Sequence, residues 1–165
     1  MNSVSPEESF TDPDPDEELV LIFLTELRSL EQALIRAGFT KVGRIHGTAQ
    51  PDWTRFVRHI EPRFHPESSP ELEGAVSYLL YDPEKMKARR RRLLQDSPFG
   101  ETSSAQSDIL WLSELVRATG NKLTHGIPFL KKDDFDAAEI TATLMVVEAW
   151  SYCDPTIERL LTHVQ

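Results

Sequence analysis

The sequence repeatedly places a helix-capping residue directly before a proline. An oxygen of the capping side chain accepts a hydrogen bond from the first helical turn, and proline fits that turn because its missing N–H has no partner there. No stretch alternates apolar and polar residues long enough to predict a strand, and no internal repeat is present. The sequence therefore predicts an all-α fold, a single-domain helical bundle. Four such pairs are interpreted as helix starts, namely Asp14-Pro15, Ser69-Pro70, Asp82-Pro83 and Asp154-Pro155.

Apolar residues at helical spacing give the extent of each helix. The longest pattern runs from Leu19 to Leu34 and stops at Gly38, whereas residues 39–50 contain two glycines and are predicted to form a loop. The three tryptophans are assigned to the core or to a dimer interface. A later helix, with Ile109, Leu112, Val116 and Thr119 facing inward, starts at a cap on Ser104 or Ser107. The other predicted helices are 51–60, 69–80, a basic segment 82–94, 135–152 capped by Asp133, and 154–163.

Composition and length indicate one domain that does not enter a membrane. The chain has 165 residues, and its longest apolar run, Leu19 to Leu24, is far too short to cross a bilayer. No signal peptide opens the sequence. The single cysteine, Cys153, excludes an internal disulfide and suits a reducing cytoplasm. The histidines lack the spaced partners that a metal site needs, so neither a metal nor a cofactor is expected.

Charge is distributed unevenly along the chain. Residues 1–18 hold seven acids and no base, which accounts for −7 of the net charge of −9. We predict an acidic flexible tail over residues 1–13 and a helical domain over 14–165. The segment of six bases is predicted either to contact RNA, to form a solvated helix face or to bind the acidic tail. These bases are Lys85, Lys87, Arg89, Arg90, Arg91 and Arg92.

Arg117, Asn121 and His125 recur at intervals of four residues. On a continuous helix they share one face, because each step of four residues rotates by only about 40°. A guanidinium binds phosphate through its planar fork, and a histidine transfers protons near neutral pH. Together they point to chemistry on a phosphodiester. In the alternative interpretation the helix ends at Gly120, and the three side chains then face different directions.

Three patches of the chain resemble the HEPN superfamily, small all-helical proteins that include many prokaryotic ribonuclease toxins and anti-phage effectors. The likeness spans roughly residues 18–163, and only its last patch is a functional signature. The family pattern is an arginine, a polar residue, three variable positions and a histidine, and here glycine stands where that arginine is expected. The patches are 30–34 with 37–39 and 51–56, then Tyr78-Leu79-Leu80, then 121–126 with Asn121, His125 and Gly126.

The resemblance implies a metal-independent endoribonuclease of the toxin or phage-defence type. His125 would act as general base or acid, Asn121 would orient it or the phosphate, and Arg117, one turn earlier, would replace the arginine missing at Gly120. Family members usually form homodimers with one composite cleft, and an antitoxin protein is a candidate partner. The alternative is a catalytically silent relative, a dimerising module that binds RNA or protein. A weaker third reading is a structural or regulatory helical protein that contacts partners through its basic segment and does not bind nucleic acid.

Overall fold

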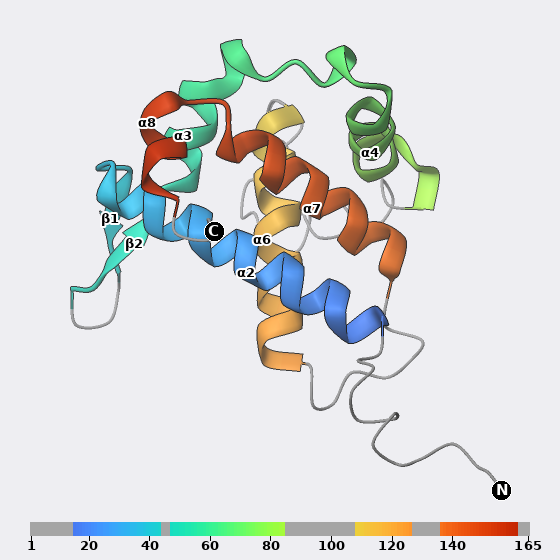
Figure 1. Ribbon diagram of the computed structural model, residues 1–165, viewed down its shortest axis with the longest axis horizontal. Helices are drawn as coiled ribbons and strands as arrows, with labels where there is room; N and C mark the ends of the chain where they lie inside the picture. The colour runs from blue at the N-terminus through green and yellow to red at the C-terminus, as the bar shows by residue number, and fades with distance from the viewer. Residues whose placement is uncertain (1–14, 44–46, 85–107, 127–135, 162–165) are drawn as a thin grey trace, which may run out of the picture.

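The computed structural model describes residues 15–43, 47–84, 108–126 and 136–161. Within these ranges the chain forms six α-helices, two 3-10 helices and one small antiparallel sheet (Figure 1). The predicted all-α fold is therefore confirmed. The α-helices are α2 (Pro15–Arg36), α3 (Trp53–Ile60), α4 (Pro70–Tyr81), α6 (Asp108–Gly126), α7 (Ala137–Ser151) and α8 (Pro155–Leu160), and the 3-10 helices are η1 (Glu61–Arg63) and η2 (Pro66–Ser68).

Helix α2 ends at the predicted glycine. Gly38 has a φ of +93°, a left-handed conformation that glycine adopts without strain. The N–H of Phe39 donates to the carbonyl of Leu34, and the N–H of Gly38 donates to that of Ile35. This pair of bonds is a Schellman motif, which satisfies two of the last free carbonyls of the helix. The glycine thus turns the chain sharply out of α2.

The segment predicted as a loop contains a short β-hairpin, so that prediction was wrong. Strand β1 (Thr40–Val42) pairs antiparallel with β2 (Ala49–Pro51), and Lys41 lies opposite Gln50. Three-residue strands are too short to produce a readable alternation of apolar and polar residues. The hairpin lies beside the C-terminal end of α2 (Figure 1), and it lines one pocket together with residues of α6. The hairpin matters because it brings Lys41 and Gln50 close to both helices.

Side-chain caps start several of the helices where the sequence predicted them. Ser69 accepts from the N–H of Leu72, and Asp154 accepts from the N–H groups of Thr156 and Ile157. The cap of α7 is Asp136, which accepts from the N–H of Glu139, so the predicted start two residues earlier was wrong. The end of α8 was also misplaced, because that helix stops at Leu160 instead of running to 163.

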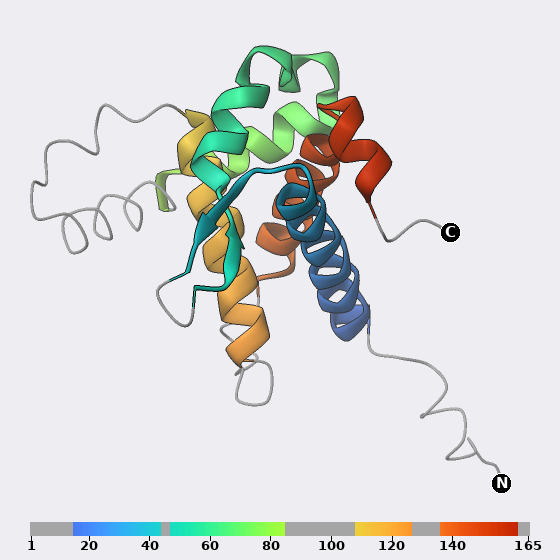
Figure 2. The ribbon, with the colours of Figure 1, turned by 90° about the vertical axis from the view of Figure 1, so that its left-hand side faces the viewer.

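The core lies where α2, α6 and α7 meet. Helices α2 and α7 lie side by side, and α6 crosses both of them (Figures 1 and 2). Helices α3 and α8 lie at one end of the bundle, and α4 packs against α7 toward the other end. All three tryptophans are buried, as predicted for core residues, and Trp150 is fully enclosed. The four residues predicted to face inward from α6, namely Ile109, Leu112, Val116 and Thr119, are also buried.

Some predictions fall outside the described residues. These are the acidic tail over 1–13, the basic segment from Lys85 onward, the caps at Ser104 or Ser107, and the proposed cap Asp133. At the start of the basic segment, the Asp82 side chain accepts from the N–H of Glu84, which is the expected capping bond. No helix in the described part of the chain is long and apolar enough to span a membrane.

Candidate functional site

Helix α6 continues without a break past Gly120 to Gly126. The interpretation in which the helix ends at Gly120 is therefore wrong. Arg117 and Asn121 lie one turn apart on the same stripe, and both line one pocket. His125 lies on the next turn of the helix, and its side chain lies outside what the structure describes. The helical register that the motif requires is thus present from Arg117 onward.

Gly120 of α6 faces the Leu27 side chain of α2. A Cβ atom added at Gly120 would lie 2.5 Å from Cδ2 of Leu27, a residue that is itself buried. Real carbon atoms do not approach so closely, so any side chain at this position would require the Leu27 side chain to move within the core. The absence of a side chain at Gly120 therefore leaves room for Leu27 of α2. An arginine introduced here would meet α2.

A polar pocket of about 320 Å³ lies between α2, α6, the hairpin and the start of α3. Its apolar wall is formed by Leu24, Leu27, Pro51 and Trp53, and Gly120 also lines it. We call it the cationic pocket, because its charged lining contains three bases and one acid. The polar lining is Arg28 and Glu31 from α2, Lys41 and Gln50 from the hairpin, and Arg117, Asn121 and Thr124 from α6.

The bases of the cationic pocket are largely free of protein partners. Arg117 pairs with Glu114 at 3.3 Å, but both side chains are 40% exposed or more, so the pair is weak. Among the described residues, Arg28, Lys41 and Asn121 make no direct hydrogen bond or ion pair through their side chains. These donors therefore remain available to an anionic ligand.

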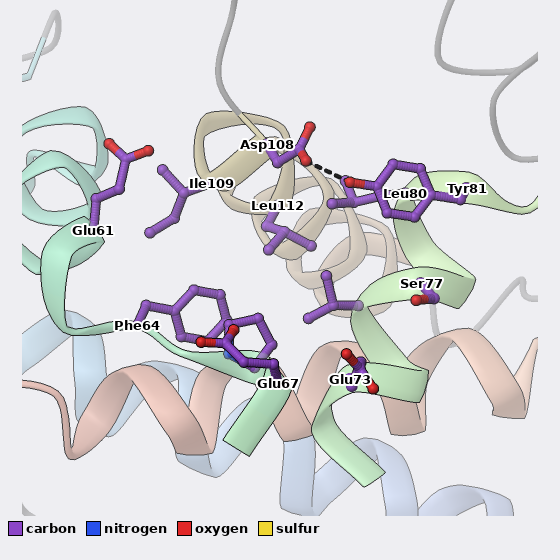
Figure 3. A pocket seen from close by; sticks show the side chains of 12 residues that line it. Glu61, Phe64, Glu67, Glu73, Ser77, Leu80, Tyr81, Asp108, Ile109 and Leu112 are labelled. Atoms are coloured by element: carbon purple, nitrogen blue, oxygen red, sulfur yellow. Dashed lines mark hydrogen bonds between the residues drawn. The ribbon is translucent and has the colours of Figure 1, made fainter. Parts of the chain in front are cut away.

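A second pocket, of about 300 Å³, lies at the opposite end of α6. Its charged lining within the described residues is entirely acidic, so we call it the acidic pocket. The Tyr81 hydroxyl donates to Oδ2 of Asp108 at 2.5 Å, which closes one side of this pocket (Figure 3). The acids that line it are Glu61, Glu67, Glu73 and Asp108.

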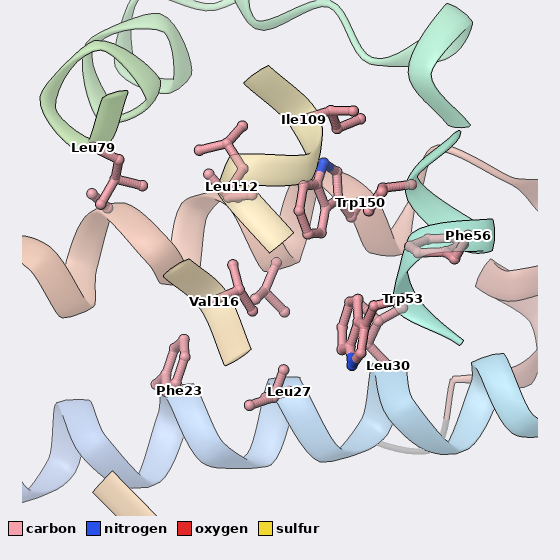
Figure 4. Close-up of a cluster of buried hydrophobic side chains, with 14 of the residues drawn as sticks. Phe23, Leu27, Leu30, Trp53, Phe56, Leu79, Ile109, Leu112, Val116 and Trp150 are labelled. Atoms are coloured by element: carbon pink, nitrogen blue, oxygen red, sulfur yellow. The ribbon is translucent and has the colours of Figure 1, made fainter. Parts of the chain in front are cut away.

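Glu31 is the one acid of the cationic pocket. Partial burial raises the pKa of its carboxyl above the ordinary value, while the charges of Arg28 and Arg117 and a hydrogen bond with the Trp53 side chain lower it. Figure 4 shows the indole nitrogen of Trp53 turned toward α2, the helix that carries Glu31. The carboxylate is thus held in the wall of the pocket by the indole, with two guanidinium groups nearby.

His59, Asp154 and Arg63 form a separate polar cluster around the start of α8. The His59 Nε2 lies 2.7 Å from Oδ2 of Asp154, and Nη1 of Arg63 lies 3.4 Å from the same oxygen. Burial raises the pKa of the neighbouring Cys153 to about 11, so its thiol stays protonated and is not a nucleophile. This cluster holds the α8 cap in place. Its role is structural.

The structure brings Arg117 and Asn121 to one pocket, while the predicted RNA-binding residues of the basic segment lie outside the described residues. Sequence reasoning missed Arg28, Glu31 and Lys41, which come from two distant segments and follow no local motif. Comparisons with protein-family models, with curated proteins and with solved structures found no match to this chain. The fold and the site define an all-α domain with a cationic pocket at the crossing of two helices.

Proposed function

We propose that the cationic pocket binds the phosphodiester backbone of single-stranded RNA. The observation that carries this proposal is the unbroken helix α6, which presents Arg117 and Asn121 to the same pocket as Arg28 and Lys41. Guanidinium and ammonium donors without strong protein partners bind phosphate oxygens through charge-assisted hydrogen bonds. The net positive lining attracts a polyanion locally although the chain as a whole is acidic.

We further propose that the bound RNA is cleaved without a metal ion. In this reaction the ribose 2′-hydroxyl attacks the adjacent phosphorus, the 5′-oxygen leaves, and a cyclic phosphate remains. His125, one turn beyond Asn121, would accept the proton of the 2′-hydroxyl or protonate the leaving oxygen. Arg117 would stabilise the charge that develops on the phosphorane, and Asn121 would orient the phosphate or the histidine. A homodimer would place two such motifs across one cleft.

A catalytically silent RNA-binding protein is the second candidate, and the packing of Gly120 favours it. The position at which HEPN nucleases carry an arginine contacts Leu27 here, so this chain has no cation at that point of the helix. Arg117 must then act from one turn away. The silent form shares the same RNA-binding surface and differs only in the chemical step.

Substitution of His125 by alanine separates these two functions. With a chelator present, the change should slow RNA cleavage by about 10²- to 10⁴-fold, the usual contribution of a general acid or base. RNA affinity should stay close to that of the wild type. Arg117→Ala should weaken both affinity and cleavage, whereas Lys122→Ala, an exposed cation of α6 outside the pocket, controls for the loss of a charge.

Each outcome selects one interpretation. Binding without cleavage by the wild-type chain would establish the silent form. Cleavage that survives Arg117→Ala would show that Arg117 does not replace the missing arginine. A chain that neither binds nor cleaves RNA would exclude the proposed function. Sedimentation equilibrium tests the homodimer separately.

A further inference from the structure

The Glu31 carboxylate lines the cationic pocket, and the proposed binding of phosphate does not explain why an acid is present there. A carboxylate repels phosphate, and its presence among Arg28, Lys41 and Arg117 lowers the affinity of the pocket for a simple anion. Glu31 makes no direct ion pair with a described residue, since Arg117 pairs with Glu114 instead. Its oxygens therefore keep acceptor capacity that the protein itself does not fill.

The Glu31 carboxylate contacts the wall of the pocket. The buried Trp53 side chain hydrogen-bonds to it, which fills part of the acceptor capacity of its two oxygens. An ionised carboxylate only accepts hydrogen bonds, so a ligand that places a phosphate on the cations must also present N–H donors to Glu31. The pocket thus matches a ligand that carries both negative charge and N–H donors. A nucleotide has this combination.

We infer that Glu31 makes the cationic pocket selective for guanine. Guanine is the RNA base whose pairing edge carries two adjacent N–H donors, N1–H and the N2 amino group, which match the two oxygens of one carboxylate. Uracil offers one N–H between two acceptors, and adenine and cytosine each place an acceptor beside their amino group, which would face the carboxylate unfavourably. Proteins that read single-stranded RNA contact the pairing edges of unstacked bases in this way.

The remaining polar lining fits the rest of a guanosine nucleotide. The amide of Gln50 supplies N–H donors for the O6 carbonyl, while Arg117, Arg28 and Lys41 supply donors for the phosphate. A volume of about 320 Å³ lies at the small end of the range for ligand pockets, as suits one nucleotide unit. This inference rests on the proposed binding of RNA and adds the base that is recognised.

Binding of labelled oligouridylates with one central substitution tests the inference. The central base is guanine, hypoxanthine, adenine or uracil, and affinity is measured by fluorescence anisotropy. Hypoxanthine differs from guanine only in lacking the N2 amino group, so it should bind roughly tenfold more weakly, the usual effect of one hydrogen bond to a charged group. Adenine and uracil should bind more weakly still. This comparison of the four oligomers requires only the wild-type chain.

The substitution Glu31→Gln should remove the preference for guanine over adenine. Glutamine keeps the size of the side chain and one acceptor oxygen, but its amide N–H₂ opposes a guanine donor and matches the acceptor of adenine. The variant should lose the preference for guanine and bind the adenine oligomer at least as well. An undiminished preference for guanine in this variant would overturn the inference.

The outcomes also distinguish the inference from the function on which it rests. Equal affinity of the wild-type chain for all four oligomers would overturn guanine selection and leave RNA binding intact. Tighter binding of every oligomer by Glu31→Gln would show that Glu31 only repels phosphate, which also overturns the inference. Absence of binding to any oligomer would exclude the proposed function itself.

Discussion

The two ends of helix α6 border pockets of opposite charge. The N-terminal end lines the acidic pocket through Asp108, and the C-terminal half lines the cationic pocket through Arg117 and Asn121. The net charge of the chain is −9, yet acidic and basic side chains are separated along this single helix. The comparison teaches that total charge does not decide which ligand a surface attracts, because ionic attraction in salt acts over about 10 Å.

The two pockets also differ in how far the protein satisfies their polar groups. In the acidic pocket, Tyr81 donates to Asp108 and His65 lies 3.3 Å from Glu67, so two of the acids already have a protein partner. In the cationic pocket, Lys41 and Asn121 have none among the described residues, and Arg28 interacts with Glu31 only through its charge. A polar side chain that lines a pocket and has no protein partner can bind a ligand without first breaking an interaction within the protein. The following predictions test this contrast.

The largest expected effect concerns the packing of Gly120 beside the cationic pocket. Gly120→Ala and Gly74→Ala gain the same helix propensity, but only the first new Cβ meets another atom, because nothing lies within 4 Å of a Cβ at Gly74. Overpacking should leave Gly120→Ala about 1–3 kcal/mol less stable than Gly74→Ala. Urea unfolding measures both. Equal stabilities would show that α2 and α6 are not in close contact at Gly120.

The next effect is on RNA affinity. Arg28→Ala should weaken binding about tenfold, or about 1.4 kcal/mol, and should reduce the slope of log affinity against log salt by about one phosphate contact. Arg36→Ala removes an exposed arginine of the same helix outside the pocket and should leave both values unchanged. Glu73→Gln, in the acidic pocket, is a second control. Equal losses for Arg28→Ala and Arg36→Ala would mean that RNA binds by diffuse charge.

A smaller effect is expected in the acidic pocket. Tyr81→Phe removes the hydroxyl that donates to Asp108 and should cost about 0.5–1 kcal/mol, because the side chain is half exposed. The same variant should bind RNA as tightly as the wild type. A loss of RNA affinity in Tyr81→Phe would contradict the division of α6 into two independent sites.

The smallest effect is on the pH dependence of stability. Because burial raises the pKa of Glu31 in the folded chain, its contribution to stability is fully present below the unfolded pKa of about 4.3 and is lost as pH rises through the folded value. The stability of Glu31→Gln should therefore change less with pH than that of the wild type above about pH 4.3. Chemical unfolding at pH 4, 5, 6 and 7 measures this difference. A free energy of unfolding that changes more steeply with pH in the variant than in the wild type would contradict the predicted direction of the Glu31 effect.

The sequence predicted the helices better than the sites, for a physical reason. Helix starts and ends depend on residues within one turn, so Ser69, Asp154 and Gly38 could be read locally. The hairpin was not predicted because strands of three residues are too short to show an alternation of apolar and polar residues. Helix α7 begins later than predicted because the nearby aspartates are equally good caps by sequence.

The candidate site could be predicted only in part. Arg117 and Asn121 were found because they share one helix and follow its period. Arg28 and Lys41 join them through the crossing of α2 over α6 and through the hairpin, contacts that depend on tertiary packing. The role of Gly120 was ambiguous because a glycine favours both a helix end and a close helix crossing. The contact with Leu27 decides between these two.

The indole N–H signals of the three tryptophans in a proton–nitrogen NMR spectrum test the central claim most directly. Trp53 lines the cationic pocket, whereas Trp111 and Trp150 are buried and line neither pocket. Addition of single-stranded RNA should shift the Trp53 indole signal in proportion to occupancy and leave the Trp150 signal in place. Saturating RNA that leaves the Trp53 signal unmoved would contradict binding at the cationic pocket.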